Sequence, residues 1–289
     1  MRRVSGYWQV AGIYACAFGA VALTFPYMNP YLLELGFSGV QIGSMFAAAS
    51  LLGLVLTPLA SALADRSGRH RSILWAALLT EMAALGCLSF APVLVVVGGG
   101  VMVMRAIIPL DMAMRDRLTL HWIGEHHAGA YGGLRLWGSL GFALVGIMSG
   151  PVAERFGTAW LFAGAGLMLI GVLIFSRVYA ARLPVGAADT AEAPAPAFRR
   201  MGRLSPVMAV IMATALMSAV GQSGYFGWNY EFIDHGLGGG KSAVGLYASL
   251  AALVEAPVML LADRLLRRHS AALVWGAGLL IWGASWLLL

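Results

Sequence analysis

The chain has 289 residues, of which 60% are hydrophobic and only 11% are charged. A soluble domain carries about 25% charged residues because its surface faces water, so this composition excludes a soluble protein and predicts an integral membrane protein. The net charge of +6 does not indicate nucleic-acid binding, since the basic residues stand singly or in short groups between apolar blocks.

Nine apolar blocks, each long enough to cross a bilayer core of roughly 30 Å, follow one another along the chain. The predicted helices span residues 7–33, 40–64, 72–91, 93–114, 131–150, 158–179, 205–231, 242–262 and 271–289. A long polar stretch, "LPVGAADTAEAPAPAFRRMGR", is rich in Ala and Pro and predicts a flexible linker after the sixth helix. We therefore expect an N-terminal six-helix half at 1–182, a linker at 183–204 and an incomplete C-terminal half at 205–289.

The basic residues predict the orientation of the chain. With a cytoplasmic N-terminus, 15 of the 19 Lys and Arg residues fall in cytoplasmic segments, and only Arg155 and Lys241 fall in outer loops. This count places Arg115 in the cytoplasmic loop after the fourth helix. By the positive-inside rule we expect a multi-pass protein of the cytoplasmic (inner) membrane with its N-terminus inside.

One basic phrase occurs twice. Residues 63–72 read "LADRSGRHRS" and residues 261–270 read "LADRLLRRHS", and the two Asp residues lie 198 positions apart. Each phrase follows the second helix of its half, which predicts two parallel halves of six helices. Parallel six-helix halves are the layout of the major facilitator superfamily.

The first copy carries the resemblance to that superfamily. Residues 61–73, "SALADRSGRHRSI", are similar to its loop signature G-x-L-A-D-R-x-G-R-R-x-x-L. The resemblance implies an all-α integral membrane protein with the major facilitator fold, in which about 8–9 of twelve transmembrane helices are present. It also implies a cytoplasmic gating loop that pairs across to the other half, formed by Asp65, Arg66, Gly68, Arg69, Asp263 and Arg264.

Four further stretches resemble one branch of the superfamily. They are "GFSGVQIGSMFAA", "IPLDMA", "YGGLRLWGSLGFALVG" and "SAVGLYASLAALVEAPVMLLADRLLRR". The branch contains phenylpropionate permeases, nucleoside–proton symporters and lactose-permease-like sugar symporters. The resemblance implies a secondary transporter that moves an aromatic acid, sugar or nucleoside together with a proton by alternating access, without enzymatic activity, cofactor or metal.

Length sets this chain apart from full members of the superfamily, which have twelve helices. We expect helices 10 to 12 to be missing, because the sequence stops inside the ninth. The alternative is a truncated membrane protein that does not transport, or a partner subunit. The oligomeric state is not predicted.

Charged residues inside the spans mark candidate binding groups. A charge at the centre of a span costs about 2.5–3.5 kcal/mol on insertion scales, so such residues are expected to face a cavity or one another. Arg135 occupies the position of a substrate-binding Arg in the sugar symporters, and its guanidinium offers a planar fork of donors. The alternative is that Arg135 only extends to the cytoplasmic edge. Phe142, two turns later, matches an aromatic that stacks on the sugar ring, with plain packing as the alternative.

Carboxylates supply the other candidates. Asp111 follows Pro109 and is a hypothetical partner for Arg135, or a proton or solute site, with an interfacial Asp as the alternative. Glu255 lies in the apolar run "LVEAPVM" and is a candidate proton or solute group. Glu81 is expected to form a structural pair. Arg105 resembles an Arg of the superfamily's fourth helix that is linked to proton coupling.

The seventh helix is expected to line the central cavity, as it does in the superfamily. It carries the candidate solute-binding residues Tyr225 and Asn229. The alternative for both residues is an anchoring role at the membrane interface.

Overall fold

The computed structural model describes residues 2–90, 93–126, 131–184 and 206–285, and its regular elements are helical throughout these ranges. The helices are α1 (Arg2–Thr24), α2 (Met28–Glu34), α3 (Gly39–Ser67), α4 (His70–Phe90), α5 (Leu94–His126), α6 (Tyr131–Phe156), α7 (Ala159–Phe175), η1 (Ser176–Val178), α9 (Pro206–Glu231), η2 (Phe232–Gly236), α10 (Gly240–Arg268) and α11 (Ala271–Ser285).

Six stretches of the described residues are long and apolar enough to cross a membrane. They are Gly6–Glu34, Gly39–Ser67, His70–Phe90, Leu94–His126, Tyr131–Phe156 and Ala159–Val178. α9 and α10 have 26 and 29 residues and are of similar length. The prediction of a multi-pass, all-α membrane protein is confirmed.

Two predicted helices have different bounds in the structure. The first is interrupted by a turn at residues 25–27, because Pro26 lacks a backbone N–H and disfavours helical geometry in the residue before it. The fourth was expected to end near Met114, and that prediction is wrong, since α5 continues for three more turns to His126. Arg115 therefore lies inside a helix and is buried, not in a cytoplasmic loop.

Sequence explains both ends of α3. Its start is fixed by a capping box, in which Gln41 N donates to Ser38 Oγ and Ser38 N donates to Gln41 Oε1. Its end is fixed by Gly68, which adopts the left-handed conformation at φ +66° that Gly tolerates best. Asp65 and Arg66 of the first basic phrase consequently occupy the last turn of α3, and only the following residues form the connection to α4.

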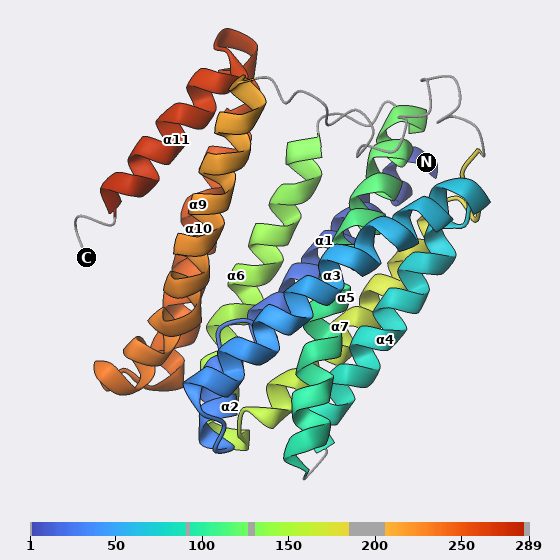
Figure 1. Ribbon diagram of the computed structural model, residues 1–289. Helices are drawn as coiled ribbons and strands as arrows, with labels where there is room; N and C mark the ends of the chain where they lie inside the picture. The colour runs from blue at the N-terminus through green and yellow to red at the C-terminus, as the bar shows by residue number, and fades with distance from the viewer. Residues whose placement is uncertain (1, 91–92, 127–130, 185–205, 286–289) are drawn as a thin grey trace.

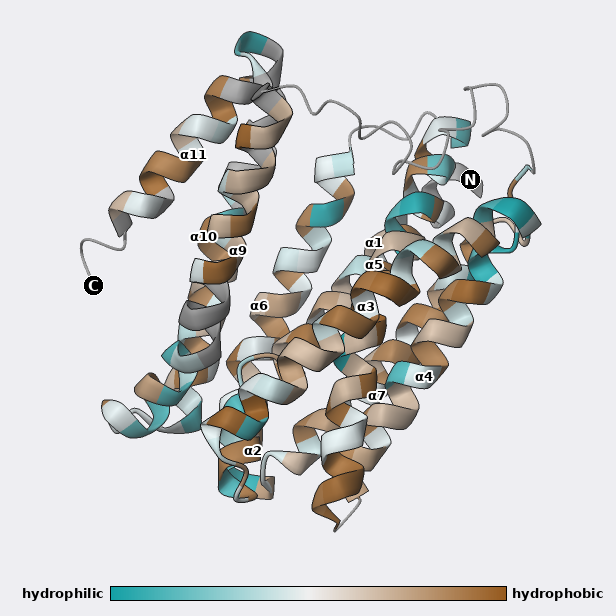
Figure 2. Ribbon diagram, viewed as in Figure 1, coloured by the Kyte–Doolittle hydropathy of each residue, from teal (hydrophilic) through white to brown (hydrophobic). Residues whose placement is uncertain are grey.

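Helices α1 to α7 form one bundle, and α9, α10 and α11 lie to one side of it (Figure 1). α1 packs against α6 and α7, α5 packs against α3 and α4, and α4 packs against α7. α2 and the start of α10 lie at the end of the molecule opposite to the N-terminus (Figure 1). Outer faces are strongly apolar, as on α3 (Figure 2), where the Leu54 and Leu59 side chains are exposed. Apolar outer faces are what helices in contact with lipid require.

The first six spans contact the later helices chiefly where α10 packs along α6. Small residues allow the two backbones to approach closely there. A Cβ atom added at Gly150 would lie 2.4 Å from Ser242 Cα, and one added at Gly245 would lie 2.6 Å from the Gly146 carbonyl oxygen. Gly146 and Gly150 are spaced as in the small-xxx-small pattern that joins helices in membranes. The packing of α6 on α10 therefore depends on the absence of side chains at these positions.

We expect Gly150→Ala to destabilise the protein by roughly 1–3 kcal/mol, because the new methyl group would overlap the α10 backbone. The measurement is the melting temperature in detergent, followed by size-exclusion fluorescence. Gly133→Ala is the matched control, since it lies on the same helix and a Cβ there meets nothing within 4 Å. Equal melting temperatures for the two variants would contradict the close α6–α10 contact.

Candidate functional site

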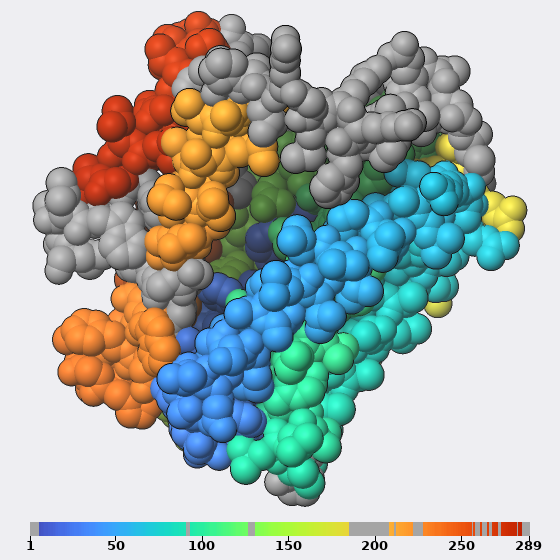
Figure 3. Space-filling view, viewed as in Figure 1, coloured from blue at the N-terminus to red at the C-terminus, as the bar shows by residue number. Residues whose placement is uncertain are grey.

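A cavity of about 370 Å³ lies within the first six spans. This volume is in the range of roughly 300–1,000 Å³ that is typical of small-molecule sites. Side chains of α1, α3, α4, α5 and α7 line it, and aromatic and aliphatic groups such as Phe18, Ile108 and Met112 form most of its wall. On the face seen in Figure 3 the molecule is hollowed between α3 and the helices after residue 205, with atoms of α1 and α6 at the floor of the hollow.

The polar wall of the cavity centres on Arg115. Its guanidinium forms an ion pair with Asp111, one turn earlier on α5, and both side chains are buried. Glu81 reaches the same group from α4 and interacts electrostatically with Arg115. Asp111 thus pairs directly with Arg115, Glu81 adds a nearby buried negative group, and all three residues line the cavity.

Several polar atoms of this cluster have unused bonding capacity. Oδ1 of Asp111, Oε2 of Glu81 and Nε of Arg115 are buried and have no hydrogen-bond partner among the described residues. Most buried polar atoms in proteins are hydrogen-bonded, because leaving one unpaired costs free energy. The cluster is therefore a buried polar group with incomplete hydrogen bonding, and its three residues line the cavity.

Arg105 is a second charged residue in the wall of the cavity. Its guanidinium carbon lies 3.8 Å from the centroid of the Phe46 ring, and it lines the cavity without forming an ion pair with any described residue. It precedes Arg115 by ten residues, which corresponds to about 15 Å along the axis of α5. The two cations therefore occupy different levels of the cavity.

Arg135 lies next to the cavity wall. Its guanidinium carbon is 5.2 Å from the centroid of Phe18, whose ring lines the cavity, and it donates to the Tyr131 hydroxyl over 3.4 Å. Asp111 pairs with Arg115 in this structure, and not with Arg135. Phe142 is half-buried and packs against the hydrophobic core.

The candidates after residue 205 lie apart from this cavity. Glu255 is exposed on α10, and Asn229 is half-buried on α9. Neither residue lines the cavity. The side chains of Tyr225, Asp263 and Arg264 lie outside the described residues.

Contacts of the first basic phrase stay within the first six spans. Asp65 accepts a hydrogen bond from His70 Nε2 at 2.8 Å and pairs with Arg117 of α5 at 3.0 Å. The Gly68 carbonyl accepts from Leu183 N at 2.9 Å. Arg66 and Arg69 are exposed. Among the described residues, this phrase therefore ties α3 and α4 to α5 and to the segment after η1.

A second polar group adjoins the Arg115 cluster. The Tyr14 hydroxyl donates to Asp116 Oδ1 at 2.8 Å, and the Tyr179 hydroxyl shares a hydrogen bond of 2.6 Å with Thr119. Burial raises the pKa of Tyr179 above its usual value, so its phenol stays protonated at neutral pH. Both contacts bring residues of α5 against other spans, and they hold the buried segment of α5 that carries Arg115.

Arg115 was not predicted as a site residue, because its position suggested a cation of a cytoplasmic loop. The available signal was its spacing from Asp111, since residues four apart on a helix face one another and opposite charges there form pairs. Glu81 was expected to be paired structurally, and the structure adds that it lines the cavity.

We expect Arg115→Gln to destabilise the fold by about 3–5 kcal/mol, because it leaves the Asp111 and Glu81 carboxylates without a buried cation. Thermal unfolding in detergent measures the effect. Arg177→Gln is the control, since Arg177 is exposed. Adding Asp111→Asn to Arg115→Gln should recover part of the loss, and a single Arg115→Gln variant as stable as the parent would refute the role of the cluster.

Comparisons with known proteins agree with the fold. The model of the MFS_1 like family matches residues 7–289. The maltose permease of Geobacillus stearothermophilus is 31% identical over 281 residues, which cover 94% of this chain and 67% of the permease. The raffinose permease of Escherichia coli is 25% identical over 182 residues, or 59% of this chain and 42% of that protein.

A solved structure shows the same arrangement of helices. The crystal structure of the nucleoside transporter NupG superposes with a TM-score of 0.68 at 11% sequence identity, over 91% of this chain and 68% of NupG. This chain thus spans about two thirds of the length of the maltose permease and of NupG, and less than half of the raffinose permease. The chain belongs to the MFS_1 like family and is a multi-pass membrane protein with the major facilitator fold.

Proposed function

We propose that this chain belongs to a secondary active transporter that moves a small organic solute, a sugar or a nucleoside, in symport with protons. The observation that carries the proposal is the cavity with its buried ionic wall of Glu81, Asp111 and Arg115. Carboxylates and guanidinium groups bind hydroxyls through charge-assisted hydrogen bonds, while rings such as Phe18 offer an apolar face to a sugar or base. The similar maltose and raffinose permeases support this class of solute.

The charges of the same wall support the proposed proton coupling. Glu81 and Asp111 line the cavity beside the single buried guanidinium of Arg115, and an uncompensated charge in the membrane is costly, so we infer that one of the two carboxylates takes up a proton during the cycle. Arg105 and the Arg115 cluster are proposed to bind solute and proton. Arg135, Phe142, Tyr225, Asn229 and Glu255 remain proposed contributors by family resemblance.

The proposed mechanism is alternating access, in which residues 1–182 and 205–289 move relative to one another and open the cavity to one side at a time. We assign the N-terminus to the cytoplasm of the inner membrane, because the basic residues collect on that side. Without the buried Arg115, the cytoplasmic segments still contain far more basic residues than the outer loops. α2 and the start of α10 then face the outside.

The test uses the full chain reconstituted into liposomes with an imposed pH gradient, acidic outside. Labelled maltose, raffinose, uridine and phenylpropionate are the probes. We expect at least one probe to accumulate and a protonophore to abolish the accumulation. Equal retention of all four probes in protein-containing and protein-free liposomes would overturn the proposal and favour a non-transporting protein.

Arg105→Gln should lower the initial uptake rate of the transported probe about tenfold or more, because a charge-assisted hydrogen bond is worth roughly 1.5–3 kcal/mol. Arg177→Gln, which removes an exposed cation far from the cavity lining, is the matched control and should leave the rate unchanged. Uptake at the parent rate by Arg105→Gln, with normal incorporation into liposomes, would remove Arg105 from the site.

A further inference from the structure

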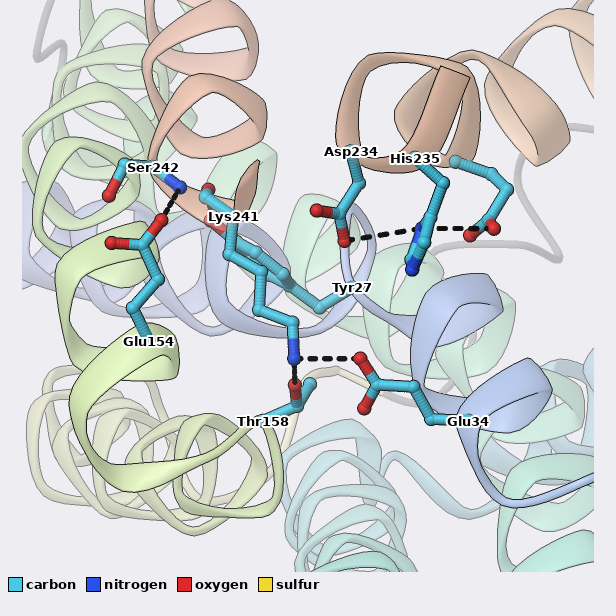
Figure 4. Close-up of polar contacts among 9 residues, drawn as sticks. Tyr27, Glu34, Glu154, Thr158, Asp234, His235, Lys241 and Ser242 are labelled. Carbon is cyan, nitrogen blue, oxygen red and sulfur yellow. Dashed lines mark hydrogen bonds and ion pairs between the residues drawn. The ribbon is translucent and has the colours of Figure 1, made fainter. Parts of the chain in front are cut away.

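At the end of the molecule that carries α2, one lysine joins three elements (Figure 4). Lys241, at the start of α10, places its Nζ 2.8 Å from Glu34 Oε1 at the end of α2. The same ammonium group donates to Thr158 Oγ1, between α6 and α7, at 2.8 Å. Lys241 thus contacts two separate segments of the first six spans from a helix that follows residue 205.

The backbone around Lys241 is held as well. Ser242 N donates to Glu154 Oε1 of α6 at 2.9 Å (Figure 4). The Tyr27 hydroxyl donates to the Lys241 carbonyl oxygen at 3.2 Å and shares a hydrogen bond of 2.8 Å with Ser149. These contacts lie beside the close approach of Gly150 to Ser242. We call Glu34, Glu154, Thr158, Lys241 and Ser242 the outer latch.

The opposite end has a different pattern. Asp65 pairs with His70 and Arg117, and Arg71 donates to the Tyr179 carbonyl, all within the first six spans. Of the ion pairs between described residues, the one that joins the first six spans to the later helices is Lys241–Glu34. Among the described residues, ion pairing between the two parts of the chain therefore lies at the outer latch, in addition to the packing of α10 along α6.

The exposure of the Glu34 side chain suggests that its ion pair with Lys241 can break and form again. The Thr158 side chain is buried and gives Lys241 a fixed partner, whereas the Glu34 side chain is 41% exposed. A partly exposed carboxylate regains its hydration as soon as its partner leaves, so breaking the pair does not strand a buried charge. His235 pairs with Glu231 at 3.1 Å, a contact inside the α9–η2 segment that stays formed if the two parts of the chain separate.

We propose that Lys241 is a positioning residue of the transport cycle, which holds the outer end of the pathway closed by bridging Glu34 and Thr158. This inference rests on the proposed function and orientation. The ion pair and hydrogen bonds of Lys241 involve no residue of the cavity lining, so in this proposal it acts on which side the cavity opens to and not on solute binding itself.

The test measures access to the cavity without any solute. Cys16 and Cys87 are replaced by Ala, and Thr24→Cys puts a thiol at the cavity lining, where the Thr24 side chain is 8% exposed. A membrane-impermeant maleimide is applied to right-side-out and to inside-out membranes. In the parent chain we expect slow labelling from the outer side.

Lys241→Met should speed labelling in right-side-out membranes roughly fivefold or more, because it removes both bonds of the ammonium group while keeping the length of the side chain. Glu34→Gln removes only the ion pair and should act in the same direction. The exchange Lys241→Glu with Glu34→Lys should return labelling toward the parent rate. Arg155→Met is the matched control, since it removes an exposed cation of α6 near the same end.

Unchanged outer labelling in both Lys241→Met and Glu34→Gln, at parental surface expression, would overturn the inference. Should Lys241→Met fail to reach the membrane, Glu34→Gln decides alone, since it alters a half-exposed side chain. If the labelling changes occur but no probe accumulates, the role of the outer latch is supported and the proposed transport function is refuted.

Discussion

A buried guanidinium needs compensating charge, and this constraint on Arg115 organises the centre of the molecule. Because α5 continues past Met114, Arg115 lies where water does not compensate it, and Asp111 and Glu81 supply the negative charge from α5 and α4. The electrostatic requirement is therefore met where α4 packs against α5. The same carboxylates line the cavity, so one set of charges meets a structural need and provides the polar wall of the site.

The first six spans and the later helices are joined by two kinds of contact, and the ion pairs at the two ends of the bundle differ. Close backbone contact of α6 with α10, based on Gly146, Gly150 and Gly245, provides packing without directional charge. The Lys241–Glu34 pair adds a directional contact at one end, while Asp65 at the other end is occupied by His70 and Arg117. In the proposed cycle, the glycine contact holds α6 and α10 close together, and the ion pair determines which end is closed.

The length of the apolar blocks predicted where the helices lie, but it did not predict well where they end. Blocks of about 20 apolar residues predict each span, since the bilayer requires them. The end of α5 was missed because "MRDR" resembles a loop, whereas Arg115 and Asp116 are held by Asp111 and Tyr14. Lys241 was counted as a loop cation, and no local pattern predicts its contacts with Glu34 and Thr158, 207 and 83 residues away.

The candidate site was likewise predicted only in part from the sequence. Asp111 and Arg105 were predicted from the cost of a charge in a span, and both line the cavity. Arg135 was expected as the partner of Asp111, and the observed partner, Arg115, was missed because the fourth helix was expected to end near Met114. The Arg135 guanidinium of α6 lies over the ring of Phe18, and the same ring lines the cavity. Thus α6 contacts the site through an aromatic ring of α1. Because α6 also packs on α10, α6 is the helix through which the later part of the chain adjoins this aromatic wall of the cavity.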